Sequence, residues 1–149
     1  MRAAAVDLDA VLGDTRPLWS AWLEDFTRRA RVELELPEDR AAAIPELDRA
    51  AGNWRALLQR FAEDHVALHV RPHPEVNAAL RTLSANGVRL AAFTDAPPEL
   101  ASIALAHLGV ARRLEVVETG PRALERLLER LGPDTAVVRT RDELFRATA

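Results

Sequence analysis

Four short apolar runs separated by helix-like segments are the feature that most constrains the fold of this chain. The runs cover residues 3–6, 88–93, 114–117 and 135–138, and each has the length of a buried strand. Between them, apolar residues recur at the three- and four-residue spacing that is typical of amphipathic helices. Strands that alternate with helices predict a parallel sheet covered on both faces. We therefore expect a three-layer α/β fold.

One long helical stretch, residues 16–70, interrupts this alternation directly after the first run. Helical spacing is clear from Leu18 to Arg31, weaker and Ala-rich from Arg40 to Arg49 with a break at Pro45, and clear again after Asn53, which we expect to be a helix cap. All three tryptophans lie in this stretch, so we expect it to have a small core of its own. We interpret it as a helical cap, residues 16–70, inserted into a core formed by residues 1–15 and 71–149.

Composition excludes several classes of function. The chain has 149 residues, a formal net charge of -3 and no cysteine, so it offers no basic surface for nucleic acid or anionic lipid and no thiolate metal site. It contains no run long enough to span a bilayer, and no signal peptide precedes the first strand, so we expect a cytoplasmic protein, monomeric or homodimeric. The 20 basic residues are all arginine, so any chemistry that needs a cation must use a guanidinium.

Polar side chains follow three of the four runs. Asp7 and Asp9 end the first run, Thr94 and Asp95 end the second, and residues 139–143 follow the last. The carboxyl ends of parallel strands meet at one edge of a sheet, where ligands bind in open α/β folds. Two acids one residue apart repel unless a cation or a shared proton relieves them. The pair is therefore either a metal and phosphoryl-transfer site or an exposed turn rich in aspartate.

Residues 6–15, from Val6 to Thr15, resemble the opening motif of the haloacid dehalogenase-like hydrolases. Residues 72–83 are similar to the segment before that family's second motif, and residues 90–95 resemble the second motif itself. The resemblance implies a Rossmann-like core with a helical cap. It also implies a small-molecule phosphate ester as substrate, Asp7 as a nucleophile that forms an aspartyl-phosphate, and Asp9 as general acid and then base.

The same resemblance implies further ligands. Magnesium would lie between Asp7, the backbone carbonyl of Asp9 and one more acid, for which Asp142 is the candidate. Thr94 and Asp95 would bind the phosphoryl group. The family's third motif is a lysine, and the matching segment here, residues 119–122, offers only Arg122, which is also a phosphate-binding candidate.

The fourth motif departs from the family pattern. An arginine and a threonine, Arg139 and Thr140, stand where the family has Gly-Asp, and Asp142 and Glu143 act either as late substitutes or as helix-capping residues. Arg139 and Arg141 could themselves offset the repulsion between the two acids without a metal. Three functions therefore stay open: a magnesium-dependent phosphatase, a non-catalytic member that binds a ligand or a protein, and, with less support, a dehalogenase.

Overall fold

The computed structural model describes residues 1–149 and contains one parallel sheet of four strands, in the order β3-β2-β1-β4. The strands are β1 (Ala3–Asp7), β2 (Arg89–Thr94), β3 (Val116–Thr119) and β4 (Thr135–Val138). In the register, Asp7 lies beside Phe93, and Val6 lies beside Val138. The residues that follow β1, β2 and β4 therefore meet at one edge, as the sequence predicts.

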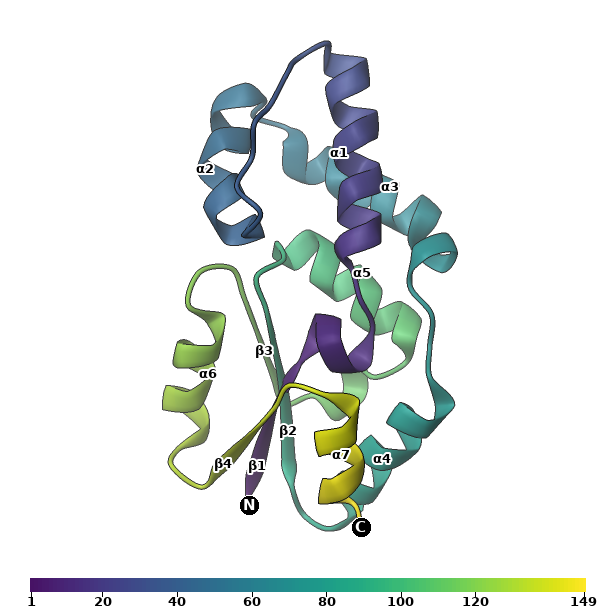
Figure 1. The fold of residues 1–149 in the computed structure, drawn as a ribbon, viewed down its shortest axis with the longest axis vertical. Helices are drawn as coiled ribbons and strands as arrows, with labels where there is room; N and C mark the ends of the chain where they lie inside the picture. Colours follow the sequence, from purple (N-terminus) through teal and green to yellow (C-terminus); the bar gives the residue numbers. More distant parts are fainter.

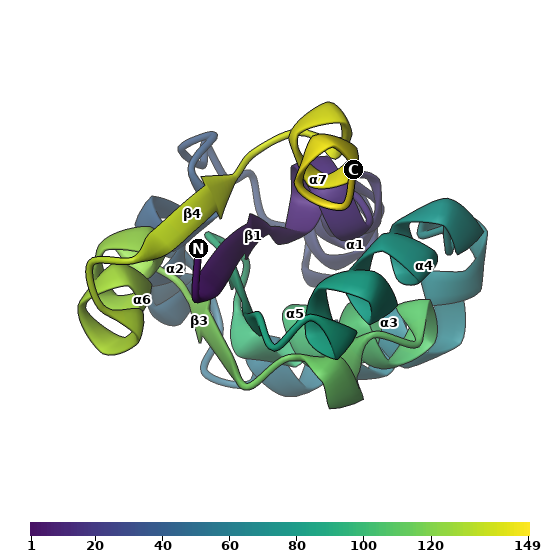
Figure 2. The same ribbon diagram turned by 90° about the horizontal axis from the view of Figure 1, so that it is seen from below.

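Helices cover both faces of the sheet (Figures 1 and 2). The helices are α1 (Arg16–Ala30), α2 (Arg40–Ala50), α3 (Trp54–His69), α4 (Pro74–Ala85), α5 (Pro98–Leu108), α6 (Ala123–Leu131) and α7 (Arg141–Ala147), with a 3-10 turn at Ala111–Arg113. Helix α6 packs on one face against Ala3, Ala5 and Phe93, while α4, α5 and α7 cover the other. This arrangement confirms the three-layer α/β fold.

The inner strand β1 is buried on both faces, which explains its composition. Ala4 and Val6 contribute to the larger apolar cluster, and Ala3 and Ala5 to the smaller one. Side chains alternate along a strand, so a strand buried on both sides reads as a continuous apolar run rather than as an alternating one.

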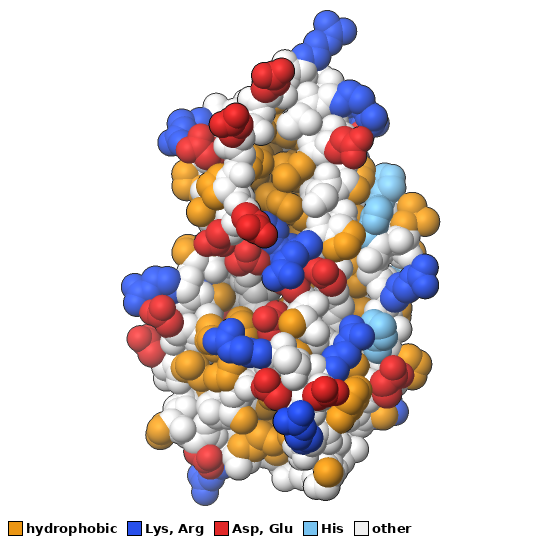
Figure 3. All heavy atoms as spheres, viewed as in Figure 1, with side chains coloured by type: hydrophobic (Ala, Val, Ile, Leu, Met, Phe, Trp, Pro, Cys, Tyr) orange, Lys and Arg blue, Asp and Glu red, His pale blue; other side chains and the backbone are white.

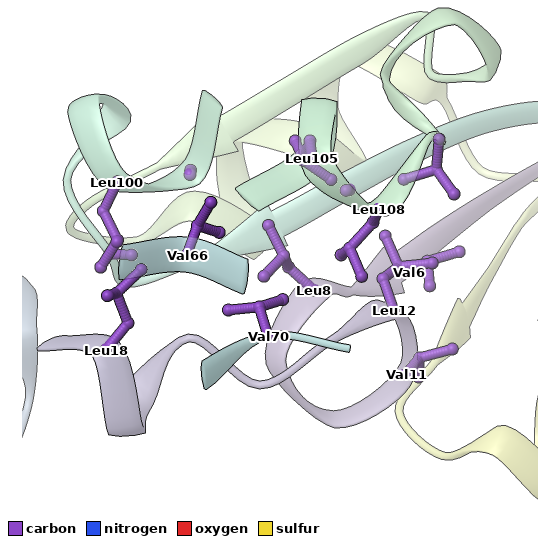
Figure 4. Close-up of a cluster of buried hydrophobic side chains, with 14 of the residues drawn as sticks. Val6, Leu8, Val11, Leu12, Leu18, Val66, Val70, Leu100, Leu105 and Leu108 are labelled. Atoms are coloured by element: carbon purple, nitrogen blue, oxygen red, sulfur yellow. The ribbon is translucent and has the colours of Figure 1, made fainter. Parts of the chain in front are cut away.

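Helices α1, α2 and α3, which we call the helical section (residues 16–70), lie beyond the carboxyl ends of the strands (Figure 1). The expectation of a separate small core for this section is wrong. Trp22, Trp54 and Leu58 belong to the same buried cluster as Val6 and the rest of the larger sheet face. Figure 4 shows the junction, where Leu18 and Val66 of the helical section lie close to Leu100 of α5.

The structure also differs from the sequence predictions at two helix positions, Pro45 and Asn53. Helix α2 continues through Pro45, which is exposed, so the missing amide does not end the helix. Asn53 precedes α3, but its side chain makes no capping hydrogen bond. None of the helices combines the length and the apolar character that a membrane crossing needs.

Candidate functional site

Asp7 is the last residue of β1, and a short π-helical turn (Leu8–Leu12) follows it. Its Oδ1 accepts hydrogen bonds from the backbone N–H groups of Asp9, at 3.1 Å, and Ala10, at 3.3 Å. Its Oδ2 accepts none, and the residue is half-buried. Burial raises the pKa of Asp7, and the nearby charge of Asp9 raises it further, while the two backbone hydrogen bonds and Arg16 oppose the shift.

Asp9 is buried, and both of its carboxylate oxygens are hydrogen-bonded. Oδ1 accepts from the backbone N–H of Thr15 at 2.9 Å and from the Thr15 hydroxyl at 2.6 Å. Oδ2 accepts from the Thr94 hydroxyl at 2.8 Å and from Nη2 of Arg40 at 2.7 Å. The second acid of the pair is thus enclosed by donors, whereas the first keeps a free oxygen.

The cation beside these acids is Arg40, the first residue of α2, and its side chain is only 2% exposed. Besides Asp9, it forms an ion pair with Asp95, with Nη2 2.8 Å and Nε 3.1 Å from Oδ1. The backbone N–H of Arg40 donates to Oδ2 of the same Asp95 at 3.0 Å. Arg40 therefore ties the helical section to the ends of β1 and β2.

Both carboxylate oxygens of Asp95 accept hydrogen bonds from Arg40. Burial alone would raise its pKa, but hydrogen bonds from Arg40 and the charge of the guanidinium, together with a hydrogen bond involving Asp39, hold the pKa below its ordinary value. Thr94, the last residue of β2, is buried, and its hydroxyl accepts from the backbone N–H of Ala96 at 3.1 Å. Both phosphate-binding candidates from the second motif thus have protein partners.

A pocket of about 360 Å³ opens beside Asp7. Its lining includes Thr94 and Asp95 from the end of β2, Gly120 and Arg122 from the turn after β3, and Arg16 from the start of α1. Figure 3 shows that charged side chains of both signs gather where the helical section meets the sheet. The lining of this pocket thus combines Asp7 with two arginines, Arg16 and Arg122, and with further acids.

Arg122 lies at the rim of this pocket, with its side chain 77% exposed and paired to Glu125. It adopts the left-handed conformation, with a φ of 56°, just after Gly120, whose φ is 80°. A non-glycine residue at positive φ is uncommon and marks a tight turn. This turn keeps the guanidinium at the mouth of the pocket.

The segment after β4 forms a helix cap, not a set of inward-facing acids. The Thr140 hydroxyl accepts from the backbone N–H of Glu143 at 3.1 Å, and the Glu143 carboxylate accepts from the backbone N–H of Arg139 at 3.2 Å. This pair resembles a capping box, except that Glu143 bonds the amide one residue before the N-cap Thr140. Asp142 is exposed on the first turn of that helix.

Neither arginine of this segment neutralises the acid pair, so that expectation is wrong. The guanidinium of Arg139 packs over the Phe93 ring at 6.0 Å, and Nε of Arg141 donates to the backbone carbonyl of Val11 at 3.1 Å. Arg40 takes the role that we expected of them, but it pairs with Asp9 and Asp95, not with Asp7.

The residues present do not fit a magnesium site. No three acidic or histidine side chains lie close enough together to hold a metal ion. Of the two expected carboxylate ligands, Asp7 has one oxygen that accepts no hydrogen bond, and Asp142 is exposed on the first turn of α7. Magnesium requires oxygen ligands in near-octahedral geometry, and the guanidinium of Arg40 beside Asp9 disfavours a second cation there.

Sequence reasoning missed Arg16 and Arg40. Arg16 follows directly on the opening motif, and its position after Thr15 at the start of a helix was a usable signal. Arg40 offered no comparable signal, because it is separated from Asp9 by 31 positions and from Asp95 by 55 positions. The acidic neighbours Glu38 and Asp39 made it look like an ordinary exposed arginine.

Comparison with known proteins gives a consistent picture. A family model described as haloacid dehalogenase-like hydrolase matches residues 1–138. Among curated proteins, none matches the chain.

Several solved structures have a similar fold. CbbY from Rhodobacter sphaeroides, in complex with phosphate, aligns with a TM-score of 0.71 and 13% identity, covering 92% of this chain and 76% of its own. A putative beta-phosphoglucomutase from Thermotoga maritima aligns with a TM-score of 0.59 and 22% identity, covering 99% and 82%. A predicted phosphoglycolate phosphatase from Haemophilus somnus aligns with a TM-score of 0.58 and 15% identity, covering 89% and 72%.

Proposed function

Because this chain belongs to the haloacid dehalogenase-like hydrolases, we propose that it cleaves phosphate esters with Asp7 as the nucleophile. One observation carries the proposal: Asp7, whose Oδ2 accepts no hydrogen bond, lines a pocket that Arg16 and Arg122 also line. A carboxylate can approach a phosphate dianion only where positive charge offsets their repulsion. The phosphate bound to the similarly folded CbbY supports the same ligand class.

In this proposal, different side chains of the pocket position the nucleophile and bind the phosphoryl group. Backbone amides hold Oδ1 of Asp7, which leaves Oδ2 as the oxygen available for attack. Arg16 and Arg122 attract the phosphoryl oxygens, and Arg122 leaves Glu125 to do so. Thr94 contacts a phosphoryl oxygen only if its hydroxyl turns away from Asp9, to which it donates at 2.8 Å.

The helical section acts as a cap over this pocket, with residues 1–15 and 71–149 as the core. Its contribution comes from Arg16 and Asp39, which line the pocket, and from Arg40, which fixes α2 against the strand ends. Substrate selection would thus depend on side chains of the helical section.

A non-catalytic role is the second candidate, and a specific feature favours it. The chain has no lysine, and all hydrogen-bonding positions of Asp9 are occupied. A protein that binds a phosphorylated ligand without cleaving it would use the same arginines and would leave Asp7 unmodified.

Hydrolysis of para-nitrophenyl phosphate separates the two candidates. The wild-type chain, Asp7→Asn and the control Asp134→Asn, which changes an exposed acid next to the N-terminus, are assayed in parallel. We expect turnover by the wild type and the control, and only background release with Asp7→Asn. Binding of inorganic phosphate without any turnover would instead establish the non-catalytic role.

The same assay tests the cofactor. Because the acids do not form a magnesium site, we expect rates to be unchanged by excess magnesium or by a chelator. A strong dependence on magnesium, with a matching calorimetric binding signal, would contradict this part of the proposal.

A further inference from the structure

The outer side of α3 carries two exposed leucines and borders a cavity that the proposed function does not use. Leu68, near the end of this helix, is 71% exposed, and Leu57, about three turns earlier, is 40% exposed. A cavity of about 440 Å³ opens beside Leu57, where α1 packs against α3 (Figure 1). The large apolar side chains that line it are Trp22 and Phe26 from α1, and Leu57 and Phe61 from α3.

Two charged residues at the rim of this cavity have no partner within the chain. Arg60 and Asp64 lie one turn apart on α3, and both are exposed. Neither side chain forms an ion pair or a hydrogen bond, whereas Asp25 and Arg29, on the α1 side of the rim, pair with each other. The rim therefore offers one cation and one anion to a binding partner.

The spacing of the two leucines and the two charges is symmetric. The midpoint of Arg60 and Asp64 along the helix and the midpoint of Leu57 and Leu68 both fall at about position 62. Residues about one turn and about three turns apart project from the same side of a helix, so the four side chains share one side of α3. When a second copy of α3 crosses antiparallel about a two-fold axis at this midpoint, Leu68 of each copy lies opposite Leu57 of the other, and Arg60 lies opposite Asp64.

From this self-complementarity we infer that the chain forms a homodimer through the outer side of α3. Leu68 of each copy enters the cavity between α1 and α3 of the other copy, where the buried rings of Trp22 and Phe26 lie. Two symmetry-related ion pairs between Arg60 and Asp64 fix the antiparallel register. The interface thus combines a buried apolar anchor with a charged rim, as specific protein interfaces do.

A second copy fits this surface better than any other occupant. A different protein would have to supply an apolar side chain and two charges in the reverse order of those on α3, whereas a copy of the chain supplies them by symmetry. A small molecule would fill the cavity but would leave Leu68 exposed. No residue of α3 lines the pocket beside Asp7, so the dimer leaves that pocket open and the inference does not depend on the proposed function.

Sedimentation equilibrium of the wild-type chain over a series of concentrations tests for the dimer. We expect reversible association to twice the mass of one chain. Leu68→Asp should raise the dissociation constant at least about tenfold, because a charged side chain cannot enter an apolar cavity without loss of its hydration. Gln59→Asp is the matched control, since it adds the same charge to the same helix about 180° away from Leu68. Both positions are exposed, so neither change should alter the urea midpoint.

Charge reversal tests the antiparallel register. Arg60→Asp and Asp64→Arg should each weaken the dimer, because each places like charges opposite one another twice. An equimolar mixture of these two variants should form a heterodimer in which every charge again faces an opposite one. The double variant Arg60→Asp/Asp64→Arg should also recover association with itself. A substitution that merely disturbed α3 would not be rescued by mixing.

Three results would overturn the inference. The first is a wild-type chain that stays monomeric throughout the series, including one that binds an apolar dye in the cavity and loses this binding in Leu57→Asp. The second is a dimer that Leu68→Asp leaves as tight as in the wild type. The third is a pair of charge variants that fails to associate on mixing. Turnover of para-nitrophenyl phosphate tests the proposed function separately from all three.

Discussion

At the scale of single residues, Asp7 and Asp9 show how two acids from one turn acquire different chemistry. Asp7 keeps a free oxygen and has a raised pKa because it is partly desolvated and lies near another carboxylate. Asp9 is deeper, and a guanidinium and two hydroxyls compensate its burial. Ionised groups survive burial only when they are paired and hydrogen-bonded in this way.

Arg40→Met should destabilise the fold strongly. It would leave the carboxylate of Asp9 buried without its counter-ion, and removing one partner of a buried pair costs about 3–5 kcal/mol. The free energy of unfolding in urea measures the loss. Arg49→Met, which changes an exposed pair in the same helix, should have little effect.

The double variant Asp9→Asn/Arg40→Met completes a double-mutant cycle, which measures the coupling between Asp9 and Arg40. Most of the destabilisation in Arg40→Met comes from the unpaired carboxylate of Asp9, which the double variant lacks. The double variant should therefore lose less unfolding free energy than the sum of the losses in Asp9→Asn and Arg40→Met. Additive losses would show that the pair is not coupled.

Asp95 makes stability depend on pH in the acid range. Its pKa is lower in the folded chain than in the unfolded chain, so the pairing stabilises fully above the unfolded value, about 3.9, and the effect is lost as pH falls through the folded value. The difference in unfolding free energy between wild type and Asp95→Asn should be constant near neutral pH and shrink below about pH 4. A difference that grows towards acid pH would contradict the sign of this shift.

At the scale of elements, the junction of β4 and α7 explains why the site lacks its expected acids. The end of β4 continues directly into a helix whose start is held by Thr140 and Glu143. Glu143 turns back to an amide of its own segment, and Asp142 faces solvent. The polar residues of this junction therefore stabilise a helix terminus rather than bind a ligand.

Thr140→Ala should destabilise the protein by about 1 kcal/mol, as expected for loss of an N-terminal cap. The urea midpoint measures this change, and Thr148→Ala, at the end of the same helix, is a suitable comparison. Phosphate affinity should not change, because Thr140 does not line the pocket. A large loss of phosphate affinity would place this segment in the site after all.

The strands and most helices could be predicted from the sequence because their signals are local. Residues 135–138 form β4 as expected, since an apolar run is bounded there by turn residues on one side and by charged residues on the other. The position of Asp7, Asp9 and Thr94 at one edge also follows from strand order. The partner of Asp9 does not, because the contact with Arg40 depends on how α2 packs, and no periodicity in the sequence encodes that packing.

At the scale of the whole molecule, the helical section and the sheet share one apolar cluster. Trp22 and Trp54, with ring centroids 6.0 Å apart, belong to the same buried set as Leu8, Leu100 and Leu105. Figure 4 shows side chains from α1, α3 and α5 meeting there. Arg40 adds a buried ionic contact across the same junction, so both apolar packing and ion pairs hold the helical section against the sheet.

This continuity predicts a single unfolding transition. The three tryptophans all lie in the helical section, so fluorescence reports that section alone, while far-ultraviolet circular dichroism reports the whole chain. The two signals should change at the same urea concentration, as in two-state unfolding. An earlier fluorescence transition would show that the helical section unfolds independently.

The central claim, that Asp7 attacks a phosphoryl group, is tested most directly by trapping the covalent intermediate. The protein is mixed with para-nitrophenyl phosphate, quenched in acid within the first turnovers and digested for mass spectrometry. We expect one added phosphoryl group on the peptide that contains Asp7, removable by hydroxylamine and absent from Asp7→Asn. Release of nitrophenol with no modification of Asp7, or with a modification that persists in Asp7→Asn, would contradict the claim.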